Sequence, residues 1–314
     1  MNCPEKVGEL NRRIEEVLLP LIDNDYVLWE CPYYSNIGDV LIWEGELQFL
    51  KKTKYTCLDM ASSSTCRFPK LSPEVIILLQ GGGNFGDLWR TAQNFRLKVC
   101  QAYPDNKIIL FPQTIFYMNP EQMKADARIL SAHPRLTICV RDKESYRLAC
   151  DHFGNTVLLV PDMAFCISSH TLEVFSLPEE EKALFLKRTD KEGYPVSFHF
   201  SEKMPLDVSD WPTIEKKNWQ QRLLNGLLKL DRYVPVGKYV ADRWAFCFFR
   251  KHLIQTGIRF VSRYKVIYTT RLHILILSVL LDKKCFVIDN TYGKNSSFYT
   301  TWLVNCQGIK CMEA

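Results

Sequence analysis

The feature that most constrains the fold is a repeated alternation, in the first half of the chain, between short apolar runs and longer amphipathic stretches. This alternation is typical of βα units. The apolar runs are nearly continuous, as expected for parallel strands that helices cover on both faces. We predict strands at Tyr26–Cys31, Glu74–Gln80, Lys107–Phe111, Arg135–Val140 and Thr156–Val160, and a weaker one at Tyr55–Asp59. We predict helices at Asp39–Lys51, Asp87–Ala102, Pro120–Ser131 and Asp142–Asp151.

The second half has the same kind of pattern after an interruption. Ser176–Gly193 is polar and rich in Glu and Lys, and we interpret it as an interdomain connector with some helix. Beyond it we predict strands at Pro195–Phe200, Lys265–Tyr268 and Cys285–Asp289, and helices at Ile214–Leu230, Val240–Thr256 and Arg271–Leu281. A chain of 314 residues is long for a single core. We therefore expect an α/β fold with two Rossmann-like domains, residues 1–175 and 176–314, that face each other across a cleft.

Charge and hydropathy exclude some classes of partner. The net charge is only +5 and there is no dense run of Lys and Arg, so no nucleic-acid partner is indicated. The longest apolar run, Ile274–Leu281, is far shorter than the about 20 residues that span a bilayer. Residues 1–11 have no apolar stretch of the kind found in secretory signals. We expect a soluble protein, with at most a peripheral contact at a membrane.

The twelve cysteines are scattered and include no CxxC pair, which argues against both a zinc site and a disulfide framework. Several lie inside apolar stretches, where a free cysteine packs as a small hydrophobic residue. Such thiols suit a reducing compartment. We therefore expect a cytoplasmic protein, with the inner face of the membrane left open as its location, and we expect no metal and no bound cofactor.

Four polar or glycine-rich segments follow predicted strands, and ligands of open α/β sheets bind beyond the carboxyl ends of strands. These segments are residues 35–39, 81–87, 141–142 and 269–273. We expect them to lie near one another at the cleft.

The glycine-rich segment satisfies the pattern GxGxxG at residues 81–86, so a dinucleotide site is one alternative. Two features weigh against it: the pattern follows a later strand than usual, and the next strand ends in Pro112 rather than near an acid for a ribose hydroxyl. A tight turn that needs positive φ is the plainer alternative. We favour a turn whose bare backbone lets a ligand approach closely, with Gly82, Gly83 and Asn84 at the cleft.

The segment in the second domain predicts an anion site. If a helix begins near Thr270, Arg271 and His273 lie in its first turn, where free N–H groups and the helix dipole attract anions. The arginine adds a forked donor, and the same surroundings lower the pKa of the histidine. A packed histidine is the plainer interpretation of His273. Arg141 lies in an analogous turn of the other domain, and two arginines at two strand ends can clamp one small dianion.

Taken in order, these segments resemble the polysaccharide pyruvyl transferases. The resemblance covers nearly the whole chain, and it rests on the ordered combination rather than on any single piece. It is carried by 36–39, Gly81-Gly82-Gly83-Asn84 with Gly86-Asp87, Pro112-Gln113-Thr114, Arg141-Asp142, Pro161-Asp162-Met163-Ala164-Phe165, Arg271-Leu272-His273, Tyr292 and Lys294. Members of this family are similar to glycosyltransferases with two Rossmann-like domains, so the resemblance implies a GT-B-like fold.

The resemblance implies that phosphoenolpyruvate is the donor substrate. Arg141 and Arg271 would bind its phosphate and carboxylate, His273 would act as the acid–base residue, and Lys294 would also reach the site. The implied reaction moves pyruvate onto a sugar as a cyclic ketal and releases phosphate. We expect the acceptor to be galactose or a related hexose of a surface polysaccharide precursor, exopolysaccharide or capsular, and a lipid-linked acceptor is left open.

One departure from the family concerns a further basic residue near the first strand of the second domain, for which the chain offers only His199 or Lys203. From their positions at strand ends and helix starts, we predict that Asp87 and Asp142 cap helices and that Asp162 accepts structural hydrogen bonds.

The acceptor side of the cleft is predicted from a helix start and from aromatic residues. Asp39, in the segment with Asn36 and Gly38, is a candidate base for the acceptor hydroxyl, and helix capping is an equal alternative. Tyr34 and Trp89 are candidates for stacking on a sugar ring.

Two rival functions remain open from the sequence. One is a nucleotide-sugar-dependent glycosyltransferase of GT-B type, which would use the glycines and arginines for a diphosphate. The other is a non-catalytic carbohydrate-binding or assembly protein, against which the joint presence of Arg141, Arg271 and His273 weighs. Binding of phosphoenolpyruvate or of a nucleotide sugar would discriminate the two enzymes.

Overall fold

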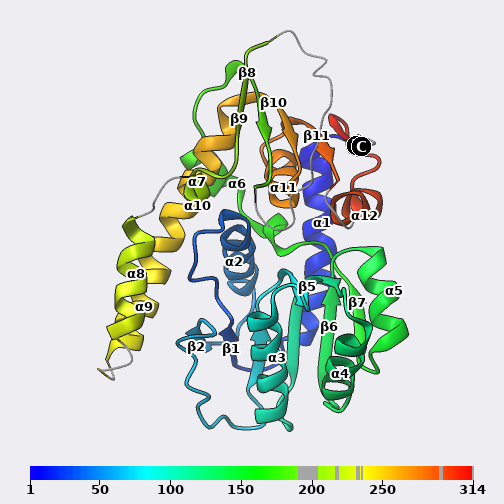
Figure 1. Cartoon of the computed structure of the whole chain (residues 1–314), viewed down its shortest axis with the longest axis vertical. Helices are drawn as coiled ribbons and strands as arrows, with labels where there is room; N and C mark the ends of the chain where they lie inside the picture. Colours follow the sequence, from blue (N-terminus) through cyan, green and yellow to red (C-terminus); the bar gives the residue numbers. More distant parts are fainter. Residues whose placement is uncertain (190–203, 216–218, 231–233, 235, 290–292, 313–314) are drawn as a thin grey trace.

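A computed structural model of the chain describes residues 1–189, 204–215, 219–230, 234, 236–289 and 293–312. Two sheets organise these residues, and all their strand pairs are parallel (Figure 1). The first sheet has the order β2-β1-β3-β5-β6-β7, with β4 paired to the end of β5, and the second has the order β12-β11-β10-β8-β9. The predicted mixed α/β class with parallel sheets is confirmed, whereas the GT-B-like arrangement stays a prediction.

The strands of the first sheet are β1 (Tyr26–Trp29), β2 (Cys57–Ala61), β3 (Ile76–Leu79), β4 (Gly82–Gly86), β5 (Ile108–Phe116), β6 (Leu136–Val140) and β7 (Thr156–Leu159). Its helical segments are α1 (Cys3–Leu18), η1 (Leu19–Leu21), α2 (Ile37–Leu50), α3 (Arg90–Ala102), α4 (Pro120–Ser131), α5 (Lys143–His152), η2 (Met163–Cys166) and α6 (Ser169–Phe175).

The strands of the second sheet are β8 (Glu180–Leu186), β9 (Leu206–Ser209), β10 (Tyr264–Thr269), β11 (Lys284–Ile288) and β12 (Ile309–Met312). The helices around it are α7 (Pro212–Glu215), α8 (Trp219–Leu230), α9 (Gly237–Trp244), the π-helical turn η3 (Ala245–Phe249), α10 (Arg250–Ser262), α11 (Leu272–Leu280) and α12 (Lys294–Trp302).

The predicted strands and helices of the first half are all present, but the predicted glycine turn is wrong. Gly82–Gly86 forms β4, because β5 continues to Phe116 and offers it a partner. Gly86 has φ of 134°, and a β-carbon there would lie 2.8 Å from the carbonyl carbon of Phe116. Glycine is therefore needed at this position for close approach of two strands rather than for a turn.

The interpretation of Ser176–Gly193 as a connector is also wrong. It contains β8, an inner strand that pairs with β10 on one side and β9 on the other. Burial of its last four residues outweighs the charged residues before them, which lie at its exposed end. The predicted strand Pro195–Phe200 lies outside the described residues. The predicted helix Val240–Thr256 is part of a longer run, in which α9, η3 and α10 follow one another directly.

No element is predicted from the sequence for residues 1–25, yet α1 fills most of them. Asn2 and Glu5 form a capping box at its start, and Leu10, Ile14 and Leu18 form a buried stripe. In Figure 1 α1 runs alongside both sheets, and it packs against α11 and η2.

The site is positioned by a core that the two sheets share. One buried cluster includes Leu28 and Ile109 of the first sheet together with Leu184, Ile267 and Val287 of the second. Within it α2 packs against η2, α10 and α11, and Figure 1 shows α2 between the sheets. The start of α2 therefore lies beside the start of α11. Among the described residues, no helix is both long enough and apolar enough to cross a membrane.

Candidate active site

A cavity of about 820 Å³ opens where strand ends of the two sheets meet. Its lining comes from segments that are far apart in the sequence: parts of 30–39, 62–64, 83–92, 211–214 and 271–273, with Arg188 and Lys294. Such a cavity has the size of an ordinary small-molecule site. Three of the four polar segments predicted from the sequence contribute to it, and the fourth, residues 141–142, lies behind its wall.

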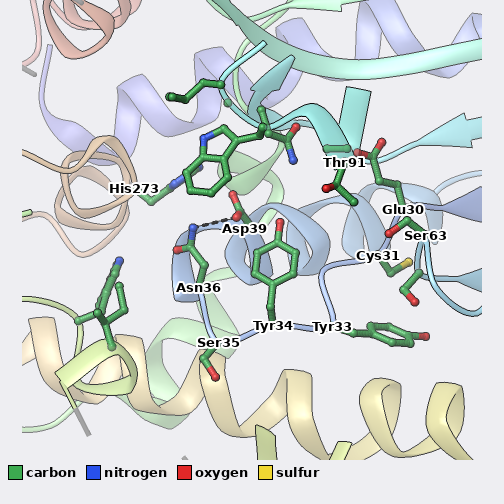
Figure 2. A pocket seen from close by; sticks show the side chains of 18 of the residues that line it. Glu30, Cys31, Tyr33, Tyr34, Ser35, Asn36, Asp39, Ser63, Thr91 and His273 are labelled. Carbon is green, nitrogen blue, oxygen red and sulfur yellow. Dashed lines mark hydrogen bonds between the residues drawn. The ribbon is translucent and has the colours of Figure 1, made fainter. Parts of the chain in front are cut away.

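The start of α2 brings an acid into the cavity. Asn36 is the N-cap, since its side-chain oxygen accepts a hydrogen bond from the N–H of Gly38 at 3.0 Å, and its Nδ2 donates to the Asp39 carboxylate at 2.8 Å. The capping alternative for Asp39 is therefore wrong. Figure 2 shows Asp39 between Tyr34 and His273, within the part of the cavity that all three line.

The ring of His273 lies against the first turn of α2. A β-carbon on Gly38 would lie 2.8 Å from Cγ of His273, so the glycine makes room for the ring. His273 Nε2 is 3.3 Å from Nη1 of Arg141 and 3.6 Å from the Asp162 carboxylate. Burial lowers the pKa of His273 below its usual 6.5, and the nearby Asp162 opposes that shift only in part. The imidazole is therefore mostly neutral at pH 7.

Arg141 is completely buried and does not line the cavity. Its guanidinium donates to Asp162 at 2.5 Å and to Oγ1 of Thr114 at 2.9 Å, whereas its Nη2 is buried with no hydrogen-bond partner among the described residues. Burial acts to raise the pKa of Asp162, but the charge of Arg141 and the contact with His273 outweigh it and hold that pKa well below the usual range. Asp162 therefore stays ionised beside Arg141.

The bare backbone of Gly83 lies against two cations, Lys294 and Arg141. A β-carbon on Gly83 would overlap Nζ of Lys294 and would lie 2.9 Å from Nη2 of Arg141. Lys294 begins α12, and the glycine before it has a left-handed φ of 76°. Gly83 and Lys294 both line the cavity, so the lysine places a positive charge in this part of its wall.

Arg271 also lines the cavity, and it is paired. Its Nε donates to Asp210 at 2.5 Å and its Nη2 donates to the other carboxylate oxygen at 2.7 Å. Each of the two predicted anion-binding arginines thus has a buried carboxylate beside it, Asp162 for Arg141 and Asp210 for Arg271. The sequence did not predict either pair.

Two further charged groups were missed. Arg188 lies two residues after the end of β8 and lines the cavity, so it occupies the place where a basic residue was expected near the first strand of the second sheet. Recognition of β8 would have found it. Glu30 also lines the cavity, with a left-handed φ of 71°, and its carboxylate binds Arg96, which in turn binds Asn84. Burial raises the pKa of Glu30 to about 7, although Arg96 opposes this.

The remaining predicted residues divide into three groups. Tyr34 and Trp89 line the cavity and are 44% and 38% exposed, as a stacking surface for a sugar would require, and Asn84 lines it too. Gly38 and Gly82 are adjacent to it but do not line it. Tyr292, His199 and Lys203 lie outside the described residues.

The acids predicted as caps behave differently from each other. Asp142 caps α5, as predicted, by accepting from the N–H of Ser145. Asp87 does not cap α3, because it accepts from the N–H groups of Met118 and Asn119 instead. No group of three or more His, Cys, Asp or Glu side chains in the described part of the chain is arranged to hold a metal ion.

The fold and the cavity define a mixed α/β protein with basic and acidic side chains around a cavity of small-molecule size, and comparison with known proteins specifies the family. The chain belongs to the polysaccharide pyruvyl transferase family, whose model matches residues 36–292. This membership confirms the resemblance seen in the sequence and does not favour the glycosyltransferase alternative.

Several relatives agree with that assignment. EpsO of Bacillus subtilis, described as a candidate pyruvyl transferase, is 35% identical over 92% of this chain and 89% of its own length. Pyruvyl transferase 1 of Schizosaccharomyces pombe is 30% identical over 88% of this chain and 69% of its own length. A solved structure of a functionally uncharacterised Klebsiella pneumoniae protein has a TM-score of 0.66 at 19% identity, covering 97% of this chain and 99% of that one, and shows the fold alone.

Proposed function

We propose that this protein transfers pyruvate from phosphoenolpyruvate to a saccharide as a cyclic ketal and releases phosphate. The observation that carries the proposal is the convergence of His273, Arg271, Lys294 and Asp39 on one cavity in a member of the pyruvyl transferase family. Lys294 and Arg271 offer positive charge for a small polyanion, and the carboxylate of Asp39 offers a base for a hydroxyl group.

The donor is proposed to lie against the positive wall of the cavity. Lys294, Arg271 and Arg188 line that wall, and Nη2 of Arg141 lies just behind Gly83. Asp210 and Asp162 fix the two guanidinium groups in place before any ligand arrives, so little orientational freedom is lost on binding. The same cations stabilise the negative charge that gathers on the departing phosphate.

The proposed reaction balances without any further reactant. His273 delivers a proton to the methylene carbon of phosphoenolpyruvate, which leaves an oxocarbenium-like centre at C2. One acceptor hydroxyl attacks C2, the bond from C2 to the phosphate oxygen breaks, and a second hydroxyl closes the ketal. Of the two hydroxyl protons, one replaces the proton that became part of the methyl group and the other leaves with phosphate. Asp39 is the proposed base for the acceptor.

The protonation state of His273 fits a relay better than a permanent acid. Burial lowers the pKa of His273, so the free site holds it mostly neutral at pH 7. An arriving polyanion raises that pKa by its charge, so the proton is taken up when the donor binds.

Tyr34 and Trp89 are the proposed platform for a galactose-type ring. The cytoplasmic location stays a prediction.

The test is phosphate release from phosphoenolpyruvate in the presence of a panel of galactosyl and mannosaminyl acceptors. We expect acceptor-dependent release by the natural sequence and its loss in His273→Ala. His170→Ala is the matched control, since His170 is exposed on α6. Full activity of His273→Ala would overturn the mechanism. Absence of release, with stabilisation by a nucleotide sugar instead of phosphoenolpyruvate in a thermal shift, would overturn the function itself.

A further inference from the structure

Helices α8 and α9 form a hairpin that Figure 1 shows at the edge of the molecule, away from both sheets. We use the name "hairpin" for α8, α9 and η3 together. α8 packs chiefly against α9 and η3. The apolar residues on the inward face of the hairpin are already covered by the rest of the protein, because Leu224, Ala241, Ala245 and Phe249 are fully buried.

The outward face of the hairpin is unusually apolar. Tyr239 is 70% exposed, Trp219 62% and Phe248 58%. Other exposed apolar side chains within residues 219–248 are Leu223, Leu230, Val234, Val236, Val240 and Phe246, and the Phe246 ring also packs edge-on against Trp43. Scattered single residues of this kind are common on proteins, but a contiguous group on one projecting element marks a surface that binds something.

The charges on this face have one sign. Within the described part of 219–251, which covers the hairpin and the first residues of α10, the exposed charged residues are all basic: Arg222, Lys229, Arg243 and Lys251. Asp242, the acid among those described residues, is turned inward, where it accepts from Tyr33, Thr65 and Lys238. The occupant of this face must therefore be both apolar and anionic.

We propose that the hairpin binds the surface of an anionic phospholipid membrane. Trp, Tyr and Phe with flanking Lys and Arg are the side chains that settle at the boundary between headgroups and acyl chains, and the bases are attracted to acidic headgroups. Lysine is depleted at protein–protein interfaces, so Lys229 and Lys251 favour a lipid surface over a protein partner.

Docking through the hairpin brings the cavity to the membrane. Gln221 of α8 accepts from Oγ of Ser35 at 2.9 Å and donates to the carbonyl oxygen of Tyr33 at 3.1 Å. The hydroxyl of Tyr33 donates to Asp242 of α9 at 2.8 Å. Tyr33 and Ser35 line the cavity, so both helices of the hairpin are fastened to its rim. A saccharide carried at the membrane surface would be presented beside that rim.

The test is co-sedimentation of the full chain with vesicles, either pure phosphatidylcholine or phosphatidylcholine mixed with phosphatidylglycerol. We expect binding to the mixed vesicles only, weakened by added salt because the attraction is screened. The triple variant Arg222→Glu, Arg243→Glu, Lys251→Glu should bind about a hundredfold more weakly, since each base near an anionic surface contributes roughly fivefold.

A second variant tests the apolar contribution to membrane binding. A control variant tests whether binding depends on the hairpin rather than on any exposed apolar or basic residue. Trp219→Ser with Phe248→Ser should bind weakly even at low salt, because the surface then lacks its aromatic anchors. Met118→Ser with Arg147→Glu changes an exposed apolar residue and an exposed base elsewhere and should bind as the natural sequence does. Circular dichroism should show every variant folded, as expected for exposed positions.

Quenching by brominated lipid locates the contact. We expect the tryptophan fluorescence of the natural sequence to be quenched by brominated mixed vesicles, and the quenching to fall in Trp219→Phe. The proposal would be overturned if the natural sequence did not bind mixed vesicles, or if the two hairpin variants bound them as tightly as the natural sequence does. Light scattering would also overturn it if the natural sequence were a dimer and the hairpin variants were monomers, because a second copy of the chain would then cover this face. These readouts need no substrate, so their failure would leave the proposed reaction untouched.

Discussion

Single side chains around the cavity show how buried positive charge is kept ready for an anion. Asp162 and Asp210 each hold one arginine by charge and hydrogen bonds, which offsets the cost of burying the guanidinium groups. Nη2 of Arg141 remains buried without a hydrogen-bond partner among the described residues. Such a group is costly unless a ligand or water satisfies it, so its position next to Gly83 agrees with an anion site there.

Gly83→Ala tests the positive wall directly. The new methyl group would overlap Nζ of Lys294, the end of a flexible side chain that can move away, and would lie 2.9 Å from Nη2 of Arg141, so it should displace both cations. We expect KM for phosphoenolpyruvate to rise about tenfold, which corresponds to roughly 1.4 kcal/mol of lost binding. Gly226→Ala on α8 is the control, since no atom lies near its new methyl group. An unchanged KM would show that Lys294 does not bind the donor.

The pH dependence of kcat/KM tests the role of His273. Burial lowers the pKa of His273 below 6.5, and the proposed acid is the protonated form. As pH rises through that pKa the free site loses the proton, so kcat/KM for phosphoenolpyruvate should fall. The pH–rate profile should be measured with the best acceptor. A rate that instead rises across this interval would identify His273 as a base rather than a proton donor.

At the scale of elements, the alternation of apolar runs and amphipathic stretches in the first half predicted six strands and four helices. Most of these strands are buried on both faces, so each is a nearly continuous apolar run that can be recognised locally. β8 was missed because its first residues, Glu180 and Glu181, are charged, and only pairing on both sides reveals it as an inner strand. β4 was missed because Gly-rich sequence favours turns, and its partner exists only because β5 is longer than predicted. Both depend on tertiary pairing, which a local pattern does not contain.

In the site, too, some features follow from local sequence and others only from tertiary contacts. The segments that contribute to the cavity could be predicted because each follows a strand, and strand ends of a parallel sheet gather at one edge. The carboxylates that hold the arginines could not be predicted, because Asp210 precedes Arg271 by 61 residues and meets it only in the folded chain. Arg188 could not be assigned while β8 was unrecognised.

Gly45→Ala tests how tightly the element that carries Asp39 is packed. Gly45 faces η2, and a new methyl group would lie 2.6 Å from the carbonyl carbon of Met163 and overlap its oxygen. Because backbone cannot step aside as a flexible side chain does, we expect a loss of about 3 kcal/mol in the free energy of unfolding. Urea denaturation measures it.

Gly8→Ala in α1 is the control for that change. No atom lies near the new methyl group, and alanine favours a helix over glycine by about 1 kcal/mol, so slight stabilisation is expected. Equal stability of the two variants would show that α2 can move relative to η2.

At the scale of the whole molecule, the two sheets are joined by more than the chain between β7 and β8. The shared cluster draws side chains from both sheets, and the amino terminus of Met1 donates to the carbonyl oxygen of Asn305 at 3.3 Å. α1 precedes the first sheet in the sequence but packs against α11 beside the second. The cavity depends on this union, because its lining comes from both sides.

The division of the chain at residue 175 separates the two sheets, and the shared core leads us to expect that the two parts fold as one unit. A fragment of residues 176–314 would lack α1 and α2, and so would expose the apolar residues of α10 and α11 that these helices cover. We expect one cooperative transition for the full chain, with calorimetric and van't Hoff enthalpies equal, and neither fragment folded when expressed alone. Two separate transitions, or a folded 176–314 fragment by circular dichroism, would mean that each half is stable without the shared core. In that case the positions of Asp39 and His273 would be set by docking of two stable halves, and the cavity could open and close between them.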